Sequence, residues 1–191
     1  MMDVAEATQV IEAERGSAIA VLTMSPLGFW RDVRDDDFRL LGTMGAAASI
    51  GLGLALGRPD RDVWVVDGDG SLLMQLGVTS AVADAGPRNF VHVVIDNGVY
   101  AISGAQPVPG DVDWVALARA VGYRRASVAT RVDELRVVLR QRSPGPRMVV
   151  VRCSRERPAF PPGALGAVEP AVEAARVRAS LVQEQAAAGR W

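Results

Sequence analysis

Two short polar motifs hold the residues of this chain that are best suited to chemistry, Gly-Asp-Gly-Ser at 68–71 and Asp-Asn-Gly-Val-Tyr at 96–100. Each motif follows a short apolar run, which predicts a buried strand, and open α/β sheets bind ligands at the carboxyl ends of their strands. The Asp69 carboxylate and the Asn97 amide oxygen would meet at that edge. Both are hard oxygen ligands that suit Mg²⁺ or Ca²⁺, and the main-chain carbonyl of Val99 could supply a third. We therefore predict a site for a divalent metal that carries a diphosphate.

Small residues beside these ligands fit the same interpretation. Gly68 and Gly70 remove side chains where the chain must turn tightly and approach a phosphate. Ser71 is expected to begin the following helix, where its hydroxyl and the free N–H groups can bind anionic oxygen. Gly-Asp-Gly by itself also suits a plain acidic turn, but the second motif one strand later favours the metal site.

The rest of the chain predicts the elements that position these residues. Apolar runs alternate with helical patterns, which is typical of an α/β fold with a doubly wound, mostly parallel sheet and helices on both faces. We expect one domain over residues 1–160 and a C-terminal helical extension over 161–191 that packs on the domain or on a partner. The expected strands are 18–22, 38–41, 63–66, 90–95 and 148–151, and the expected helices are 46–56, 72–85, 114–121, 132–140 and 169–188.

Composition excludes several classes of function. The 191 residues carry a formal net charge of −1, which gives no electrostatic basis for nucleic-acid binding. No apolar run reaches the roughly 20 residues of a membrane span, and the polar, acidic N-terminus is unlike a secretory signal. Cys153 is the only cysteine, so no internal disulfide can form, and we expect a cytoplasmic protein.

For other reactive or charged side chains, an ordinary structural role has to be weighed against a functional one. His92, the only histidine, lies within an expected strand, which favours a core residue over an acid–base catalyst. Cys153 follows a buried strand and is expected to be a packed thiol. An anionic substrate group could be bound by several arginines, although surface ion pairs are the commoner role of such residues. These are Arg124, Arg125, Arg152, Arg155 and Arg157.

The spacing of Gly68-Asp69-Gly70 and Asn97 resembles the signature of the thiamine diphosphate-dependent enzymes, with Asp96 where another asparagine often stands. The resemblance implies thiamine diphosphate and Mg²⁺ as cofactors. It places the Asp69 and Asn97 side chains and the Val99 carbonyl on the metal. It also implies that the surrounding residues Gly68, Gly70, Ser71 and Tyr100 contact the cofactor.

A second segment, Gly42-Thr43-Met44-Gly45, resembles the one that holds the aminopyrimidine ring in acetolactate synthase-like and pyruvate decarboxylase-like enzymes. The resemblance implies that Met44 wedges between the two cofactor rings and imposes a bent conformation. A thioether suits that place because it is apolar, unbranched and polarizable. The Gly42 carbonyl would accept a hydrogen bond from the 4′-amino group, and Thr43 would contact the cofactor beside it. The alternative is an ordinary helix N-terminus with Met44 in the core.

Across most of residues 16–153 the chain resembles the β subunits of sulfopyruvate decarboxylases and the C-terminal halves of phosphonopyruvate decarboxylases. The resemblance implies a lyase subunit that releases CO₂ and an aldehyde from sulfopyruvate or phosphonopyruvate. The part of the chain before Gly68 is too short for the second domain of such enzymes, which binds the pyrimidine ring and carries a glutamate that contacts N1′. We therefore expect a separate pyrimidine-binding (α-type) subunit in an α₂β₂ or larger assembly.

Gln106 is the best local candidate for a contact with the substrate, because the stretch 103–107 resembles a family loop. A solvated loop glutamine would look the same in the sequence. Two other functions are compatible with the same residues. One is an acetolactate synthase-like carboligase subunit, and the other is a non-catalytic, regulatory subunit that binds thiamine diphosphate.

Overall fold

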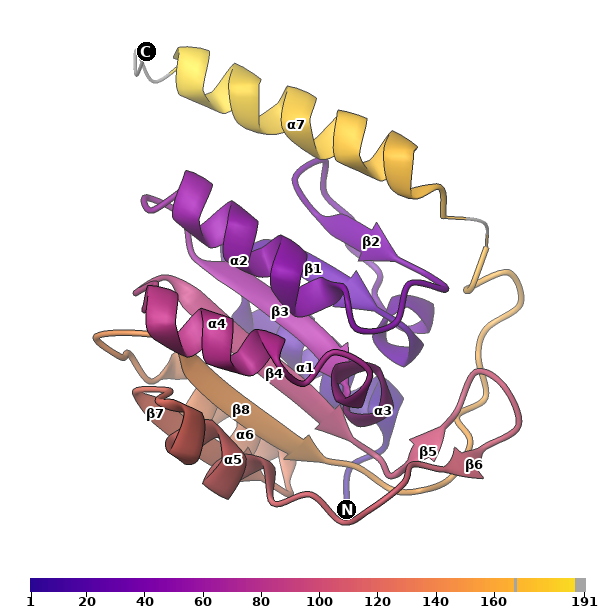
Figure 1. Cartoon of the computed structure of the whole chain (residues 1–191). Coiled ribbons are helices and arrows are strands. Elements are labelled where there is room, and N and C mark those ends of the chain that lie inside the picture. Colours follow the sequence, from indigo (N-terminus) through magenta and orange to yellow (C-terminus); the bar gives the residue numbers. More distant parts are fainter. Residues whose placement is uncertain (167, 188–191) are drawn as a thin grey trace.

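The computed structural model describes residues 1–166 and 168–187 and contains a six-stranded parallel sheet in the order β2-β1-β3-β4-β8-β7 (Figure 1). A separate antiparallel ribbon, β5-β6, follows β4 in the chain. The predicted parallel α/β sheet is thereby confirmed. The strands are β1 Ile19–Thr23, β2 Phe38–Leu40, β3 Val63–Gly68, β4 Phe90–Asp96, β5 Val99–Tyr100, β6 Gln106–Pro107, β7 Arg125–Ala129 and β8 Arg147–Arg152.

Helices cover both faces of the sheet, as predicted. Helices α2, α4 and α5 pack on one face, α7 lies beside them over β2, and α1 and α6 pack on the other face (Figure 1). Among the described residues, no helix is long and apolar enough to cross a membrane. The helices are α1 Val4–Glu14, α2 Ala47–Gly57, α3 Asp69–Leu73, α4 Val78–Ala85, α5 Trp114–Val121, α6 Val132–Arg140 and α7 Pro170–Ala187, with a short 3₁₀ turn, η1, at Ser25–Gly28.

The central strands are buried on both sides, which explains their continuous apolar sequence. On β3, Val63 and Val65 belong to the core under α2 and α4, whereas Trp64 and Val66 belong to the core under α1 and α6. Gly51 lets α2 lie close to this sheet, because a Cβ atom at that position would collide with Cγ2 of Val65. The close packing fixes the start of α2, and with it the turn at 42–45, at the carboxyl edge of the sheet.

Several elements differ from the prediction, among them the short strands β5 and β6, which were not expected. The helix expected over 72–85 is two helices, α3 and α4, because the intervening residues form tight i→i−3 turns around Gly77, a residue of low helix propensity. Strand β7 was not predicted. Its sequence, Arg-Ala-Ser-Val-Ala, has no apolar run, since an edge strand needs only one neighbour and is partly exposed.

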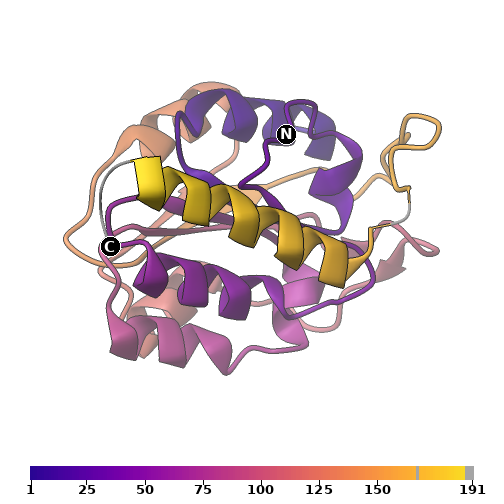
Figure 2. The same cartoon turned by 90° about the horizontal axis from the view of Figure 1, so that it is seen from above.

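Helix α7 lies alongside α2 and is attached by arginine–carboxylate contacts and by Val177 and Leu181, which pack on the core (Figure 2). The buried Glu173 carboxylate accepts hydrogen bonds from the guanidinium and the backbone N–H of Arg39 on β2, and from Arg176. Further along the helix, Glu184 pairs with Arg58 and Arg61. The expected C-terminal helix therefore packs on this chain from 170 to 187, and residue 188 lies outside the described residues.

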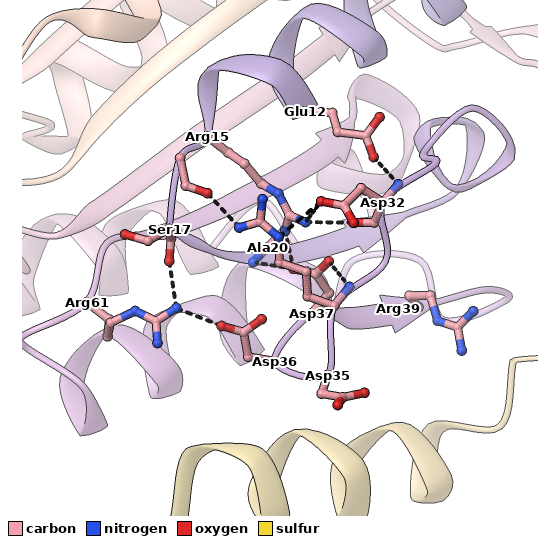
Figure 3. Close-up of polar contacts among 12 residues, drawn as sticks. Glu12, Arg15, Ser17, Ala20, Asp32, Asp35, Asp36, Asp37, Arg39 and Arg61 are labelled. Atoms are coloured by element: carbon pink, nitrogen blue, oxygen red, sulfur yellow. Dashed lines mark hydrogen bonds and ion pairs between the residues drawn. The ribbon is translucent and has the colours of Figure 1, made fainter. Parts of the chain in front are cut away.

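A buried ion pair fixes the segment between β1 and β2 (Figure 3). Asp37 is fully buried and pairs with Arg15, while its two oxygens also accept hydrogen bonds from the backbone N–H groups of Ala20 and Arg34. The Arg15 guanidinium lies 4.9 Å from the ring centroid of Trp30. Nearby, the buried Asp36 of the same loop accepts a hydrogen bond from Arg61. This network holds the loop that leads into the edge strand β2.

Removing Asp37 takes away the buried carboxylate that pairs with Arg15, and the remaining carboxylate near that guanidinium, on the exposed Asp32, lies 3.8 Å away. We expect Asp37→Ala to lower the free energy of unfolding by about 3 kcal/mol or more. Asp35→Ala is the matched control, because the Asp35 side chain in the same loop is 87% exposed and should change stability by less than about 0.5 kcal/mol. Urea unfolding followed by circular dichroism measures both. An equal loss in the free energy of unfolding for Asp37→Ala and Asp35→Ala would contradict the stabilising role of the buried ion pair.

Candidate functional site

A cavity of about 300 Å³ opens at the carboxyl ends of β1, β3 and β4. It is bounded by both predicted polar motifs and by the turn that precedes α2. Nine of the predicted site residues line it, whereas Thr43 and Gln106 do not. The nine are Gly42, Met44, Gly68, Asp69, Gly70, Ser71, Asn97, Val99 and Tyr100.

The Asp69 carboxylate connects the two motifs. It is buried at the start of α3, where one oxygen accepts a hydrogen bond from the backbone N–H of Gly70 and the other from the backbone N–H of Gly98, both at 2.7 Å. Burial raises the pKa of Asp69 to about 6, although these two hydrogen bonds act in the opposite direction. A buried carboxylate with a raised pKa and no cationic partner at the cavity is suited to a metal ion.

The remaining donors at this point are also oxygen atoms. Asn97 is buried, and its amide oxygen lies 3.4 Å from the backbone N of Val99, so the turn around Gly98 folds the two residues together. In the described part of the chain, no group of three or more histidine, cysteine, aspartate or glutamate side chains could hold a metal. The protein thus offers a carboxylate, an amide and main-chain oxygens. That donor set suits a hard divalent cation whose other ligands are phosphate oxygens or water.

The two glycines of the first motif serve different purposes. A Cβ atom at Gly70 would lie 2.5 Å from Cε1 of Tyr100 and 3.0 Å from Cγ2 of Val108, so this glycine makes room for the aromatic ring inside the protein. A Cβ atom at Gly68 would meet nothing within 4 Å. Only at Gly68 is the space beside the backbone free for a ligand on the cavity side.

Ser71 links the motif at 68–71 to the segment at 42–45, which the sequence analysis identified separately. Its buried hydroxyl oxygen accepts a hydrogen bond from the backbone N–H of Gly45 at 3.1 Å. The sequence predicts that Ser71 begins the helix that follows β3. Helix α3 begins at Asp69 instead, and Ser71 lies in its first turn. The hydroxyl still has its own proton to donate toward the cavity.

Met44 lies in an open turn and not in the core. The turn is bounded by Gly42 and Gly45, whose φ angles are +79° and +85°, in the left-handed region that favours glycine. Helix α2 begins only at Ala47, and Met44 is partly exposed to the cavity. This placement favours an apolar contact with a ligand over the alternative of a core methionine. Thr43 points away, with its side chain exposed.

Gln106 is placed on the protruding β5-β6 ribbon, outside the cavity lining (Figure 1). Its amide oxygen accepts hydrogen bonds from the Ser103 hydroxyl and from the backbone N–H of Gly104, at 2.9 and 3.0 Å. The ribbon therefore fixes this side chain against itself. A contact between Gln106 and a substrate stays a prediction.

The sequence prediction missed one wall of the cavity. Met24, Ser25 and Pro26 follow β1 and line it, and Met24 has a φ angle of +55°, which is strained for a residue with a side chain. The sequence did contain a signal for this wall, because β1 runs parallel to β3 and must also end at the carboxyl edge of the sheet. The Ser-Pro pair after an apolar run marks the turn.

The other candidate residues lie elsewhere. His92 is fully buried, with Nδ1 3.1 Å from the Tyr123 hydroxyl, and Cys153 is a buried thiol whose pKa burial raises to about 12. None of the arginines singled out above lines the cavity. Arg124 packs on Gly145, Arg125 bonds Gln141, Arg152 lies 3.6 Å from Asp96, and Arg155 lies against Gly98.

Comparison with known proteins shows the family to which the chain belongs. The family model described as "Thiamine pyrophosphate enzyme, C-terminal TPP binding domain" matches residues 30–153. Phosphonopyruvate decarboxylase of Streptomyces viridochromogenes is 49% identical over 105 residues, which cover 54% of this chain and 26% of that protein. Sulfopyruvate decarboxylase subunit beta of Methanothermobacter thermautotrophicus is 42% identical over 125 residues, 62% of this chain and 67% of that subunit.

A solved structure gives the same fold over a larger part of the chain. The thiamine diphosphate-dependent 4-hydroxybenzoylformate decarboxylase of Rhodococcus jostii RHA1 superposes with a TM-score of 0.69 at 22% identity. The match covers 82% of this chain and 33% of that one. The chain thus spans about a quarter of the phosphonopyruvate decarboxylase and a third of the solved structure.

The raised pKa of Asp69 predicts how metal binding depends on pH. Below about pH 6 a proton competes with the cation for the carboxylate, whereas above that value the ligand is already ionised. We expect the apparent Mg²⁺ affinity, measured by calorimetry with thiamine diphosphate present, to fall up to about tenfold for each pH unit below 6 and to level off above it.

Three controls accompany this measurement. Titration of free thiamine diphosphate with Mg²⁺ at the same pH values corrects for protonation of the cofactor. Asp69→Asn should bind the metal weakly at every pH, and Glu156→Gln, which changes an exposed carboxylate, should keep the original profile. A corrected affinity that is flat across pH 6 would show that Asp69 is not a ligand.

Proposed function

The chain belongs to the thiamine pyrophosphate enzymes, in which it corresponds to the C-terminal TPP binding domain, and we propose that it is the diphosphate-binding (β-type) subunit of a two-subunit 2-oxo acid decarboxylase. The observation that carries the proposal is the Asp69 carboxylate, held by Gly70 and Gly98 at the meeting point of both motifs. Similarity to decarboxylases that act on phosphonopyruvate and sulfopyruvate supports the reaction class.

The residues at the cavity fit thiamine diphosphate with Mg²⁺. Asp69, Asn97 and the Val99 carbonyl would hold the metal, and the free space beside Gly68 would admit the diphosphate. Met44 and Gly42, with the adjoining Leu41, offer an apolar wall and a main-chain carbonyl for the rings. When bound, the cofactor supplies a cationic thiazolium that accepts the electrons released as the 2-oxo acid loses CO₂. This chain positions that ring and keeps water from it.

This chain supplies only part of the catalytic groups. Asp69 is the sole acidic residue among the described residues that line the cavity, and it is committed to the metal. Two glutamates of α1 have partners away from the cavity, since Glu12 accepts hydrogen bonds from the backbone of the loop at 31–32 and Glu14 pairs with Arg136 and Arg140. We therefore assign the carboxylate that contacts N1′ to a pyrimidine-binding (α-type) subunit, in an α₂β₂ or larger assembly.

The substrate side of the proposal is a small 2-oxo acid, sulfopyruvate or phosphonopyruvate first. Among the described residues, no arginine lines the cavity, and the wall beyond the metal is apolar, formed by Met24, Pro26 and Ile102. A sulfonate or phosphonate group would therefore be bound by cationic residues of the partner subunit. Mutations of this chain should change cofactor binding and turnover more than they change substrate preference.

Release of CO₂ from sulfopyruvate, phosphonopyruvate and pyruvate tests the proposal, with Mg²⁺ and thiamine diphosphate present. The chain alone is compared with the chain co-expressed with a pyrimidine-binding subunit from the same genome. We expect release only from the pair, with an aldehyde as product. A condensed hydroxy-keto acid as product would identify a carboligase, and bound cofactor without turnover of any 2-oxo acid would identify a regulatory subunit.

Met44 gives a sharper test of the catalytic geometry. Met44→Ala should lower kcat roughly 10- to 100-fold, because the rings lose their wedge, while the metal and the diphosphate contacts are untouched. The Kd for thiamine diphosphate should change far less than kcat. Met44→Leu is the matched control, since a side chain of similar volume should retain most of the turnover. A parallel loss of affinity and kcat would mean that Met44 serves binding alone.

A further inference from the structure

We propose that three buried polar side chains, Asp67, His92 and Tyr123, form a chain of hydrogen bonds that positions the turn at 68–71 from inside the protein. We call this group the buried relay. The inference rests on the proposed function, because the turn that the relay holds is the one that would carry the metal and the diphosphate. It adds three positioning residues to that function, and none of them lines the cavity.

The buried relay lies in the apolar core layer under α2, α4 and α5. Asp67 and His92 are fully buried, and Tyr123 is 5% exposed. The strand neighbours in this layer are apolar, since His92 lies opposite Val65 on β3 and Met148 on β8. A buried polar group in such surroundings costs free energy unless it makes a hydrogen bond. The three side chains therefore depend on one another for their hydrogen bonds.

The contact between Tyr123 and His92 decides which ring nitrogen carries the proton. The Tyr123 hydroxyl lies 3.1 Å from Nδ1 of His92, which is its one hydrogen-bond partner among the described residues. Burial, together with the negative charge of Asp67, raises the pKa of Tyr123, so the phenol keeps its proton. The buried hydroxyl donates this proton to Nδ1, and the proton of the neutral imidazole is then on Nε2.

The other side of the imidazole faces the Asp67 carboxylate. Nε2 of His92 lies 3.8 Å from Oδ2 of Asp67, and in the described part of the chain neither atom has a hydrogen-bond partner. A donor and an acceptor that both lack a partner thus face each other inside the core. An N–H···O bond needs about 3 Å between the heavy atoms, so an approach of roughly 1 Å would complete the relay.

Asp67 connects the buried relay to the turn. Its other oxygen, Oδ1, accepts a hydrogen bond from the backbone N–H of Gly68 at 2.9 Å. Gly68 is the last residue of β3, and Asp69 follows it as the first residue of α3. The position of the Asp67 carboxylate is therefore coupled to the backbone of the turn at which the diphosphate would bind.

This coupling acts in both directions. A ligand that binds the turn more tightly when the relay is complete also favours the bond between Nε2 of His92 and Asp67, by the same free energy. Loss of that bond leaves the carboxylate of Asp67 without its donor and the turn less well held. Ligand affinity at the turn should then fall, although no residue that touches the ligand has changed.

The tautomer of His92 can be measured directly, because it is the only histidine of the chain. With ¹⁵N-labelled histidine, the shifts of the two ring nitrogens should show the neutral Nε2–H tautomer in the full chain, and Tyr123→Phe should weaken that preference. Addition of Mg²⁺ and thiamine diphosphate should move the proton on Nε2 downfield and slow its exchange with water, as the bond to Asp67 shortens.

Variants test the effect on the site, with the Kd for thiamine diphosphate measured by calorimetry in the presence of Mg²⁺. His92→Leu removes the donor and should raise this Kd by about tenfold. His92→Gln presents an amide N–H near the place of Nε2 and should restore most of the affinity. Tyr123→Phe, which keeps the ring, should raise the Kd by about threefold. Thr8→Val is the matched control, because it removes a fully buried hydroxyl from α1 on the opposite face of the sheet.

Several results would overturn the inference. An Nδ1–H tautomer or a doubly protonated ring in the full chain would contradict the relay, even if His92→Leu fails to fold. A Kd that neither His92→Leu nor Tyr123→Phe changes, or an equal loss with Thr8→Val, would contradict its positioning role. Cofactor affinity that depends on the relay without CO₂ release from any 2-oxo acid would uphold the inference while the proposed function fails. Release of CO₂ with a Kd that is insensitive to the relay would do the reverse.

Discussion

The Asp69 carboxylate holds the site together, because its two oxygens bind peptide N–H groups that follow two different strands. Gly70 belongs to the helix after β3 and Gly98 to the turn after β4, so a single side chain sets the distance between the strand ends. Because this carboxylate is buried, its negative charge is not neutralised by any cationic side chain among the described residues that line the cavity. The Asp69 carboxylate, which holds the two turns together, is therefore also the group that a bound cation would neutralise.

Features of the fold and the site that follow from local sequence patterns could be predicted, whereas features that depend on tertiary contacts could not. The strands under both helical layers appeared in the sequence because burial on two sides requires unbroken apolar runs, as at Val63 to Val66. The two polar motifs were found for the same reason, since they end those runs. Strand β7 was not, because pairing along one edge imposes no pattern on its side chains. The strained Met24 and the folded-back Gln106 were also beyond prediction, as tertiary contacts decide both conformations.

The groups that this chain places around the cavity are of a few chemical kinds only. This chain contributes oxygen ligands, main-chain groups and apolar walls, which suit the task of holding a metal, a diphosphate and a ring. It contributes no free acid and, among the described residues, no cation to the lining. Under the proposed function, the groups that move protons or recognise a second anion would come from the second subunit.

Helix α7 has a consequence for the solution behaviour of the sheet. β2 is an edge strand, and its outward backbone groups would otherwise be free to pair with a strand of another molecule. Glu173 occupies the N–H of Arg39, while Arg176 donates to the carbonyl oxygens of Arg34 and Asp37. Two side chains of α7 thus bind one outward backbone group of β2 and two carbonyl groups of the loop that precedes it. Residues that follow the matched TPP binding domain in the sequence therefore cover this edge of the sheet against pairing with another molecule.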